Sequence, residues 1–339
     1  MARIPVGLRW IAASLGLLVL MAVVAAGVAG WWLERPLPLA RDPVELSIEP
    51  GTNPREVANA WVEAGVQVRA EWLYQWFRAS GQARRIRAGS YSISAGTTPR
   101  TLLDKMVRGE ETLETVRLIE GWTLRQARAA LAAAPHLRPT TAGLSDAELM
   151  AALGSPGVTA EGRFFPDTYA YSRGVSDLTV LRRAHQVMQR RLASAWEARD
   201  PDLPLRRADD ALILASIVEK ETGREDERTR VAGVFVNRLR IGMPLQTDPT
   251  VIYGLGERFD GNLRKRDLLA DGPYNSYTRA GLPPGPISLP GEASLRAAVN
   301  PARTRALYFV ARGDGSSHFS ETLAEHNRAV DRYQRGKTR

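Results

Sequence analysis

The sequence predicts an α+β protein that carries one N-terminal transmembrane helix. Three observations support this fold class. An uncharged apolar run opens the chain, short alternating strands each lead into a helix-capping turn, and longer amphipathic helices dominate the second half. With 339 residues, of which 44% are hydrophobic and 24% charged, the chain has the composition of a globular protein of one to three domains.

The composition also limits the chemistry. The chain has no cysteine, which excludes disulfides, thiolate nucleophiles and metal sites built on cysteine. Its histidines are too scattered to indicate a metal cage: His136, His185, His318 and His326. The sequence therefore gives no indication of a metal site built on cysteine or histidine. The formal charge of +9 favours anionic partners such as lipid headgroups or an acidic polymer.

Residues 10–33 form an uncharged run that is long enough to span a bilayer as a helix. Trp31 and Trp32 lie at its far end, where interfacial aromatic residues belong. The alternative is a cleaved signal peptide, whose apolar core is only about 7–15 residues long. Because this run is longer, we expect an uncleaved anchor. The flanking charges weakly place residues 1–9 in the cytoplasm and the rest of the chain across the membrane.

Residues 34–43 are rich in proline and predict a stiff, extended linker. A subdomain at residues 44–112 is expected to follow. Its first strand alternates at 44–48 and leads into a helix that Asn53 can cap, with Glu56 as the capping-box partner.

The order strand, helix, helix, strand over residues 44–93 is that of a LysM-type glycan-binding module, so this region is predicted to be a LysM-like βααβ subdomain. Its helices carry aromatic residues that could stack on sugars: Trp61, Trp72, Tyr74 and Trp76. The same side chains could instead form the core of the subdomain, and for helical aromatics we favour the core.

Residues 113–339 are predicted to form a larger α+β domain, and a helix at 208–222 carries its strongest signal. At about 100° per residue, Ile217 and Val218 mark the apolar face, and Glu221 falls on the same stripe. A carboxylate buried there needs a partner or a function, unless the end of the helix is exposed. Periodicity alone does not favour either of these two interpretations.

If Glu221 faces an apolar cleft, desolvation raises its pKa and keeps a useful fraction protonated near neutral pH. A protonated carboxyl is what a general acid needs in order to protonate a leaving-group oxygen. Ser216 and Thr222 are nearby hydroxyls that could orient it.

A long irregular stretch at residues 246–287 is dense in proline, glycine and groups that recognise sugars. Loops of this length are uncommon unless they are functional, although an ordinary connection is the alternative. Together with one residue of the preceding helix, the stretch supplies the expected substrate-binding residues: Asn237, Gln246, Thr247, Asp248, Tyr274, Asn275 and Tyr277.

Five long segments occur in a fixed order: EGRFFPDTY (161–169), ASIVEKET (215–222), VFVNRLRIGMPLQTDPTVIYGLG (234–256), YNSYTRAGLPPGPISLPG (274–291) and HFSETLAEHN (318–327). With the N-terminal anchor and the LysM-like region, they resemble the endolytic murein transglycosylases, also called YceG-like or MltG proteins. The family pattern commonly has asparagine where Leu289 stands, and a different residue at Arg163.

The resemblance implies that residues 113–339 are a lytic transglycosylase catalytic domain. Such an enzyme cleaves nascent peptidoglycan glycan strands between N-acetylmuramic acid and N-acetylglucosamine, leaves 1,6-anhydro ends and terminates strand elongation. The catalytic glutamate of the family matches Glu221, and Glu219 is the less favoured alternative. The implied location is the bacterial inner membrane with the catalytic domain on the periplasmic side. Peptidoglycan synthases and the elongation machinery are candidate partners, and no cofactor or metal is required.

Two other functions are compatible with these residues. The first is a non-catalytic, membrane-anchored peptidoglycan-binding protein in which Glu221 only ends a helix. The second is a wall hydrolase that uses water and a second carboxylate, either Asp248 or Glu161. Nucleic-acid binding is disfavoured by the predicted anchor and by the lack of a recognisable motif.

Overall fold

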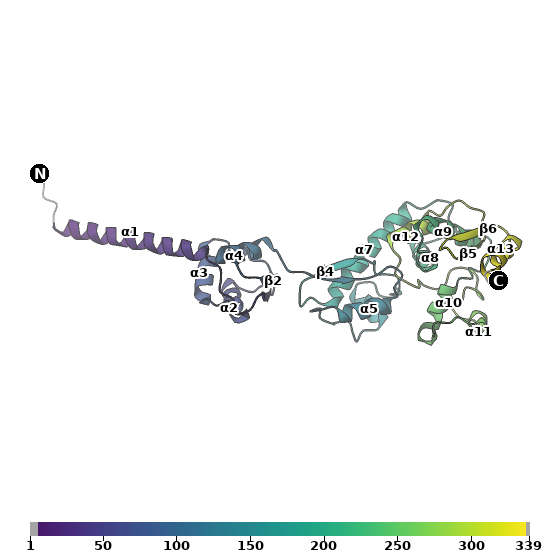
Figure 1. Ribbon diagram of the computed structural model, residues 1–339, viewed down its shortest axis with the longest axis horizontal. Helices are drawn as coiled ribbons and strands as arrows, with labels where there is room; N and C mark the ends of the chain where they lie inside the picture. Colours follow the sequence, from purple (N-terminus) through teal and green to yellow (C-terminus); the bar gives the residue numbers. More distant parts are fainter. Residues whose placement is uncertain (1–5, 337–339) are drawn as a thin grey trace. The chain divides into compact units, whose positions relative to one another are not determined.

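A computed structural model describes residues 6–336 of the chain and the side chains of residues 15–336. The chain divides into two compact units (Figure 1). Unit 1 comprises Met1–Glu114 and Ser172–Gly174, and unit 2 comprises Thr115–Tyr171 and Val175–Arg339. Of the predicted cytoplasmic residues 1–9, the first five lie outside the described part.

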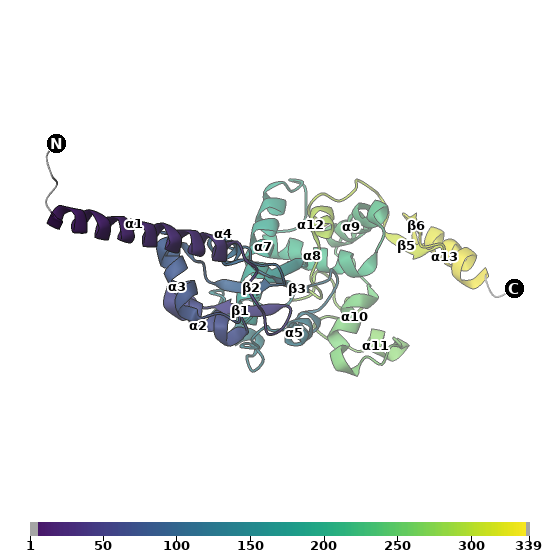
Figure 2. The same cartoon turned by 60° about the vertical axis from the view of Figure 1, so that its left-hand side comes forward.

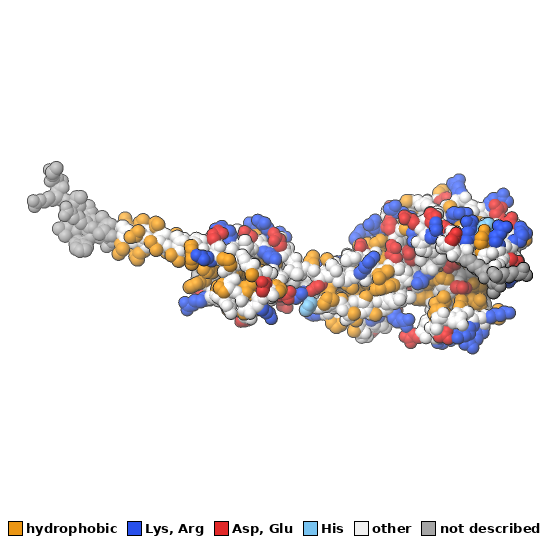
Figure 3. Space-filling view, viewed as in Figure 1, with side chains coloured by type: hydrophobic (Ala, Val, Ile, Leu, Met, Phe, Trp, Pro, Cys, Tyr) orange, Lys and Arg blue, Asp and Glu red, His pale blue; other side chains and the backbone are white. Residues whose placement is uncertain are grey.

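Unit 1 begins with a single long helix, α1 (Val6–Leu33). Its part from Leu15 to Leu33 is long and apolar enough to cross a membrane, with a mean hydropathy of 2.1 and no buried residues. Apolar side chains are accordingly exposed along this part of the helix (Figure 3). By length and composition, α1 is compatible with a single-pass membrane anchor.

The rest of unit 1 contains a two-stranded antiparallel sheet with helices beside it. Val44 pairs with Ile93 and Ile48 pairs with Gly89 across this sheet. The order strand, helix, helix, strand is as predicted, while the LysM-type assignment stays a prediction. The elements are β1 (Val44–Ile48), α2 (Pro54–Ala64), α3 (Ala70–Ala79), a 3₁₀ turn (Ala83–Arg85), β2 (Gly89–Ile93) and α4 (Pro99–Arg108).

Helix α2 begins with the capping box that the sequence predicts. The Asn53 side chain accepts hydrogen bonds from the backbone N–H groups of Arg55 and Glu56, and the Glu56 carboxylate accepts from the Asn53 N–H at 3.1 Å. This reciprocal arrangement satisfies N–H groups that the first turn of a helix leaves without partners.

The aromatic residues of α2 and α3 differ in their surroundings. Trp61 is fully buried and its Nε1 donates to the Met106 sulfur, so it belongs to the core of unit 1. Trp76 is partly buried and donates to the Pro99 carbonyl at 3.0 Å. The core interpretation therefore holds for Trp61, whereas Trp72 is 51% exposed.

Residues 34–43 are extended, as predicted, and they pack into unit 1. Leu37 is buried in the core of unit 1, and its N–H donates to the Thr97 carbonyl at 2.8 Å. Leu39 forms an isolated antiparallel bridge with Val66. The segment is extended, as expected from its prolines, but it is part of unit 1 and does not separate α1 from it.

Unit 2 is mainly helical and contains two small sheets, in which β3 pairs with β4 and β5 pairs with β6. The β5–β6 pair is antiparallel, with Tyr308 opposite Ser320. The elements are β3 (Glu114–Arg117), α5 (Leu124–Ala133), α6 (Asp146–Ala152), β4 (Thr168–Tyr171), α7 (Asp177–Glu197), α8 (Ala208–Glu221), α9 (Glu225–Arg240), α10 (Asp248–Leu255), a 3₁₀ turn (Gly256–Arg258), α11 (Lys265–Leu269), α12 (Glu292–Val299), β5 (Tyr308–Ala311), β6 (Ser317–Ser320), α13 (Leu323–Val330) and a π-helical turn (Asp331–Arg335).

Helix α8 lies at the centre of unit 2. Helices α7, α9 and α12 pack against it (Figure 2), and every residue from Ala211 to Val218 is buried. The helix is therefore buried on all sides over two turns. The single apolar stripe on which Glu221 falls is a weak signal, because position on this helix hardly decides burial.

The stretch 246–287 is not wholly irregular, which corrects the prediction. Helix α10 occupies Asp248–Leu255 and α11 occupies Lys265–Leu269. Pro249 stands in the first turn of α10, where a proline costs no hydrogen bond. The remaining connections are turns and bends.

Candidate active site

Glu221 is the last residue of α8, and its side chain is partly buried. The Thr247 hydroxyl donates to its Oε2 at 3.0 Å. Burial raises the pKa of Glu221 to about 7; the negative charge of Asp248 also raises it, while the Thr247 hydrogen bond and the positive charge of Arg238 lower it. Near neutral pH the carboxyl is therefore divided between its protonated and ionised forms.

Thr247 is fixed from the side opposite Glu221. It is 1% exposed, and its N–H donates to the Ser276 hydroxyl at 3.0 Å. The Ser276 hydroxyl also lies 2.8 Å from the Thr250 hydroxyl, and the Ser276 carbonyl accepts from the Gln246 N–H. These bonds join residues 246–250 to residues 274–277, so the hydroxyl that contacts Glu221 is held by two segments.

Asp248 and Tyr277 form a polar pair close to Glu221. The Tyr277 hydroxyl donates to Asp248 Oδ1 at 2.6 Å. Burial raises the pKa of Tyr277, so this hydroxyl keeps its proton and remains a donor. The Asp248 side chain is exposed, and its charge acts on Glu221. Three of the predicted binding residues, Thr247, Asp248 and Tyr277, are thus brought together around the predicted catalytic glutamate.

Arg238 was not among the predicted site residues. It projects from α9, is 7% exposed, and donates to the carbonyls of Leu245 and Leu307, both at 2.7 Å. Burial lowers its pKa. Arg238 therefore holds the backbone just before Thr247 and places a positive charge near Glu221. The sequence pattern that could have indicated Arg238 is an arginine on an otherwise apolar face of a helix.

The side-chain amides of Asn237 and Asn275 are engaged by backbone carbonyls, and Asn237 lines a separate cavity of about 420 Å³, so their contacts with substrate stay a prediction. The Asn237 amide donates to the carbonyls of Thr304 and Ala306 at 2.7 and 3.0 Å. Asn275 is 5% exposed, and its amide donates to three carbonyls between residues 267 and 270. Both side chains stabilise backbone turns.

Two further predicted residues have less direct roles. Gln246 has an exposed side chain and a positive φ of 48°, which sets the turn before Thr247. Tyr274 is partly buried, and its ring lies 4.8 Å from that of Tyr253. Within the part of the chain that the structure describes, neither forms a hydrogen bond with Glu221, and their contacts with substrate stay a prediction.

The hydroxyls expected to orient Glu221 do not do so. Ser216 donates to the Ile213 carbonyl at 2.7 Å and accepts from the Ile287 N–H at 3.0 Å. The Thr222 hydroxyl accepts from the Arg224 N–H at 3.1 Å. Thr247 takes this role instead, because it approaches from a different segment of the chain.

Glu219, the alternative catalytic residue, links two helices. Its side chain is 7% exposed, and it accepts a hydrogen bond from the Gly291 N–H just before α12 at 2.9 Å. The nearest atoms of Arg228 and Glu219 are 4.0 Å apart. The buried carboxylate of Glu219 is thus occupied by polar contacts that stabilise the fold.

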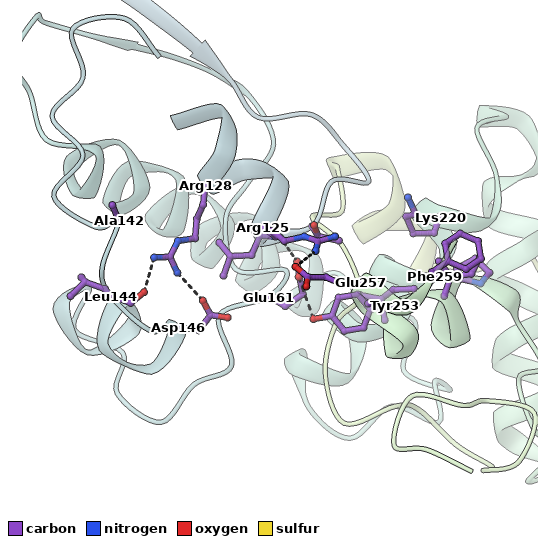
Figure 4. Close-up of a pocket in the computed structure, with 16 residues that line it drawn as sticks. Arg125, Arg128, Ala142, Leu144, Asp146, Glu161, Lys220, Tyr253, Glu257 and Phe259 are labelled. Atoms are coloured by element: carbon purple, nitrogen blue, oxygen red, sulfur yellow. Dashed lines mark hydrogen bonds and ion pairs between the residues drawn. The ribbon is translucent and has the colours of Figure 1, made fainter. Parts of the chain in front are cut away.

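A cavity of about 1030 Å³ opens in unit 2, lined by residues of α5, α10 and the 161–169 segment (Figure 4). Glu161 lies in its wall and is 7% exposed. It accepts from the N–H groups of Leu124 and Gly162, at 2.9 and 3.2 Å, and from the Tyr253 hydroxyl at 3.3 Å. Burial raises the pKa of Glu161 to about 7, although these hydrogen bonds lower it.

The cavity has charged groups of both signs at its edge (Figure 4). Arg125 pairs with Glu257 at 2.9 Å, and Arg128 pairs with Asp146 at 3.1 Å. Glu221 does not itself line this cavity, but its chain neighbour Lys220 does. The cavity and the glutamate are therefore adjacent along α8.

The YceG-like family matches residues 46–332 of the chain. An endolytic murein transglycosylase of Bacillus subtilis is 31% identical over 309 residues, which cover 86% of this chain and 84% of that protein. The chain belongs to the YceG-like family. This confirms the resemblance found in the five motifs.

Other relatives of the YceG-like chain agree. An endolytic murein transglycosylase of Streptococcus pneumoniae is 25% identical over 328 residues, covering 87% of this chain but 59% of that longer protein. The crystal structure of a YceG-like protein from Listeria monocytogenes aligns with a TM-score of 0.52 and 27% identity, over 85% of this chain and 99% of that one. The α+β fold class is confirmed by this likeness.

Within the described residues of this YceG-like protein, no three His, Asp or Glu side chains are grouped as metal ligands would be. Glu221 and the hydroxyl of Thr247 are in contact at the end of α8. A carboxyl with a pKa near 7 can both donate and accept a proton in neutral solution.

Proposed function

We propose that this protein is an endolytic lytic transglycosylase that cleaves peptidoglycan strands between N-acetylmuramic acid and N-acetylglucosamine. The observation that carries the proposal is Glu221, a partly buried carboxyl at the end of α8 whose pKa is raised to about 7 and whose Oε2 accepts from Thr247. The names of the Bacillus and Streptococcus relatives support the substrate class.

In the first step, protonated Glu221 acts as a general acid on the glycosidic oxygen. Thr247 donates to Oε2, so we assign the transferable proton to Oε1. The bond between the anomeric carbon and the glycosidic oxygen breaks, and the departing sugar takes this proton. The raised pKa supports the step because an ordinary glutamate would carry almost no proton at neutral pH.

In the second step, the C6 hydroxyl of the same muramyl residue attacks the anomeric carbon. The new C1–O6 bond closes the 1,6-anhydro ring, and the hydroxyl proton passes to the Glu221 carboxylate, which regenerates the acid. The nucleophile belongs to the substrate and has the high effective concentration of a tethered group. One carboxyl therefore suffices, whereas most glycoside hydrolases use two.

Asp248 has a supporting role in this proposal. Its charge is near enough to Glu221 to raise the pKa of that carboxyl, and Tyr277 holds one of its oxygens. A carboxylate at this place would stabilise positive charge that develops at the anomeric carbon. The same residue is one candidate for the second carboxylate of a hydrolase, so analysis of the products has to separate the two reactions.

The test is digestion of purified glycan strands, with mass spectrometry of the new ends. We expect 1,6-anhydro ends, each one water lighter than a hydrolysed end, and their loss in Glu221→Gln. Glu197→Gln is a matched control, because Glu197 also ends a helix but is exposed on α7.

Two outcomes would overturn the proposal. Reducing ends in place of anhydro ends would identify a hydrolase that activates water. Strand binding without cleavage by the unaltered chain would identify a non-catalytic peptidoglycan-binding protein, and Glu221→Gln would then change nothing.

We further propose that α1 anchors the protein in the bacterial inner membrane, with residues 1–9 in the cytoplasm and the residues that follow α1 on the far side. There the enzyme would terminate strand elongation near peptidoglycan synthases. The exposed apolar surface of Leu15–Leu33 supports this placement. Protease digestion of intact spheroplasts tests it, because residues beyond the anchor should be cleaved only if they lie outside the cytoplasm.

A further inference from the structure

A groove of about 690 Å³ lies in unit 1 at the point where α1 ends. Most of its lining is apolar, and three tryptophans contribute: Trp31 and Trp32 from the end of α1, and Trp72 from the first turn of α3. Trp31 is 59% exposed and Trp72 is 51% exposed. Large aromatic rings with this exposure, gathered on one face, indicate a surface that contacts something else.

The Trp32 and Trp72 rings pack edge to face, with centroids 6.0 Å apart and an interplanar angle of 86°. If α1 crosses a bilayer, Trp32 lies in the interfacial layer, which is about 5–7 Å thick on each side of the hydrocarbon core. A ring centred 6.0 Å away then lies no further from that layer than about its own thickness. The first turn of α3 is therefore close to headgroup depth, although it follows α1 by almost forty residues.

This geometry is held by contacts on both sides of the groove. Arg100 donates to the Glu34 carboxylate at 2.7 Å, directly after α1. The Leu37 N–H donates to Thr97, and Leu37 is buried in the core of unit 1. The end of α1 is thus fixed to the folded unit by adjacent residues, and the groove cannot open by movement of a loose linker.

The charges of the groove suit an anion. Arg35 and Arg69 are the charged residues of its lining, and the lining contains no carboxylate. Arg35 stacks on the Trp31 ring at 4.3 Å, and within the described residues neither arginine is paired with an acid. Basic side chains beside interfacial aromatics are the groups that bind the phosphates of anionic lipids.

We propose that this groove binds the headgroups of anionic phospholipids in the membrane that α1 crosses, so that unit 1 rests on the bilayer surface. This goes beyond the proposed reaction and depends only on α1 spanning the membrane. Glycan stacking is the competing use of an exposed Trp72. The lipid is favoured because the ring adjoins Trp32 at the membrane end of the unit and because both charged residues of the groove lining, Arg35 and Arg69, are basic.

The absence of cysteine allows a direct test with the full-length protein. A fluorophore would be attached to one new cysteine, and the protein reconstituted in vesicles of phosphatidylethanolamine and phosphatidylglycerol that contain nitroxide-labelled lipids. Gln67→Cys reports on the groove, in whose lining it lies with an exposed side chain. Glu49→Cys, beyond the opposite end of β1, is the matched control, and Val23→Cys reports on the middle of α1.

We expect a headgroup nitroxide to quench the label at position 67 and not the label at 49, while a mid-chain nitroxide quenches the label at 23. Replacing Arg35 or Arg69 by glutamine should weaken the binding of anionic headgroups in the groove about fivefold each and so reduce quenching at position 67, since a basic residue near an anionic surface contributes about 1 kcal/mol. In vesicles of phosphatidylcholine alone, the label at position 67 should also be quenched less than in vesicles that contain phosphatidylglycerol.

The three label positions separate the outcomes. Quenching at 23 without quenching at 67 would overturn the proposal while leaving the anchor intact. Loss of quenching at both would overturn the membrane span and the proposal with it. If soluble glycan strands shield the label at 67 and headgroup lipids do not quench it, the groove is a glycan site instead. None of these results depends on cleavage activity, so failure here differs from failure of the proposed reaction.

Discussion

The Thr247 hydroxyl and the Glu221 carboxylate lie 3.0 Å apart although they are 26 positions apart in the chain. Thr247 is buried, and it is held by Ser276 from a third segment. The glutamate therefore has a fixed orientation that its own helix does not supply. This contact also sets the protonation of the carboxyl, because a hydrogen bond to the ionised form lowers the pKa that burial raises.

The first prediction concerns pH. If Glu221 is the general acid, activity requires its protonated form, and with a pKa of about 7 the rate should fall as pH rises above about 7. An initial-rate profile from pH 5 to pH 9 on isolated strands measures this. A rate that stays constant from pH 7 to pH 9 would contradict the assignment of Glu221 as the acid.

Thr247→Val should move the alkaline limb of that profile to higher pH, because the lost hydrogen bond no longer favours the ionised carboxyl. The maximal rate should fall about tenfold, as expected for loss of a hydrogen bond of about 1.5 kcal/mol to a charged group. Thr278→Val serves as control, since Thr278 is exposed and its hydroxyl contacts Asp271 instead. An unmoved limb would show that the contact does not matter for catalysis.

Asp248→Asn should shift the same limb in the opposite direction. Removing the negative charge of Asp248 removes one cause of the raised Glu221 pKa, so the acid should lose its proton at lower pH. Tyr277→Phe removes the hydrogen bond to Asp248 but keeps the charge, and it should shift the limb much less. Equal shifts in the two variants would mean that the charge of Asp248 is not the cause.

Arg238→Met should destabilise the protein by about 2 kcal/mol or more, because the buried carbonyls of Leu245 and Leu307 lose their donor. Thermal unfolding measures the loss, and Arg240→Met, from the exposed end of the same helix, is the control. If both variants unfold at the same temperature, Arg238 does not hold the segment before Thr247 as we describe.

The raised pKa of Glu161 predicts how the stability of the folded protein changes with pH. Its folded-state pKa is raised from 4.5 to about 7, so its protonated form stabilises the fold fully below about pH 4.5, and this contribution is lost as pH rises through 7. Glu161→Gln cannot ionise. The melting temperature of the unaltered protein, relative to this variant, should therefore decrease between pH 5 and pH 8, and a constant difference would contradict the raised pKa.

Local chemistry made part of the fold predictable from the sequence. Asn53 and Glu56 are three residues apart and form a capping box whose partners are all neighbours. Helix α10 has a comparable signal in Pro249, directly after Asp248, within the stretch predicted to be irregular. This helix start is therefore also predictable from two adjacent residues.

The site was harder to predict because its contacts are distant in sequence. Glu221 was chosen from an apolar stripe, yet α8 is buried on all sides from Ala211 to Val218. The five motifs, more than periodicity, point to this helix. The surroundings of Asn275 could not be predicted, because nothing nearby in the sequence shows that its amide binds carbonyls between residues 267 and 270.

The burial of Leu37 has a mechanical consequence for an anchored protein. Residues 34–43 provide no slack between α1 and unit 1, since they are hydrogen-bonded into it. If α1 spans the membrane, unit 1 cannot drift toward distant, mature wall. Any strand that unit 1 meets must come within its own height of the bilayer, which is where new strands emerge.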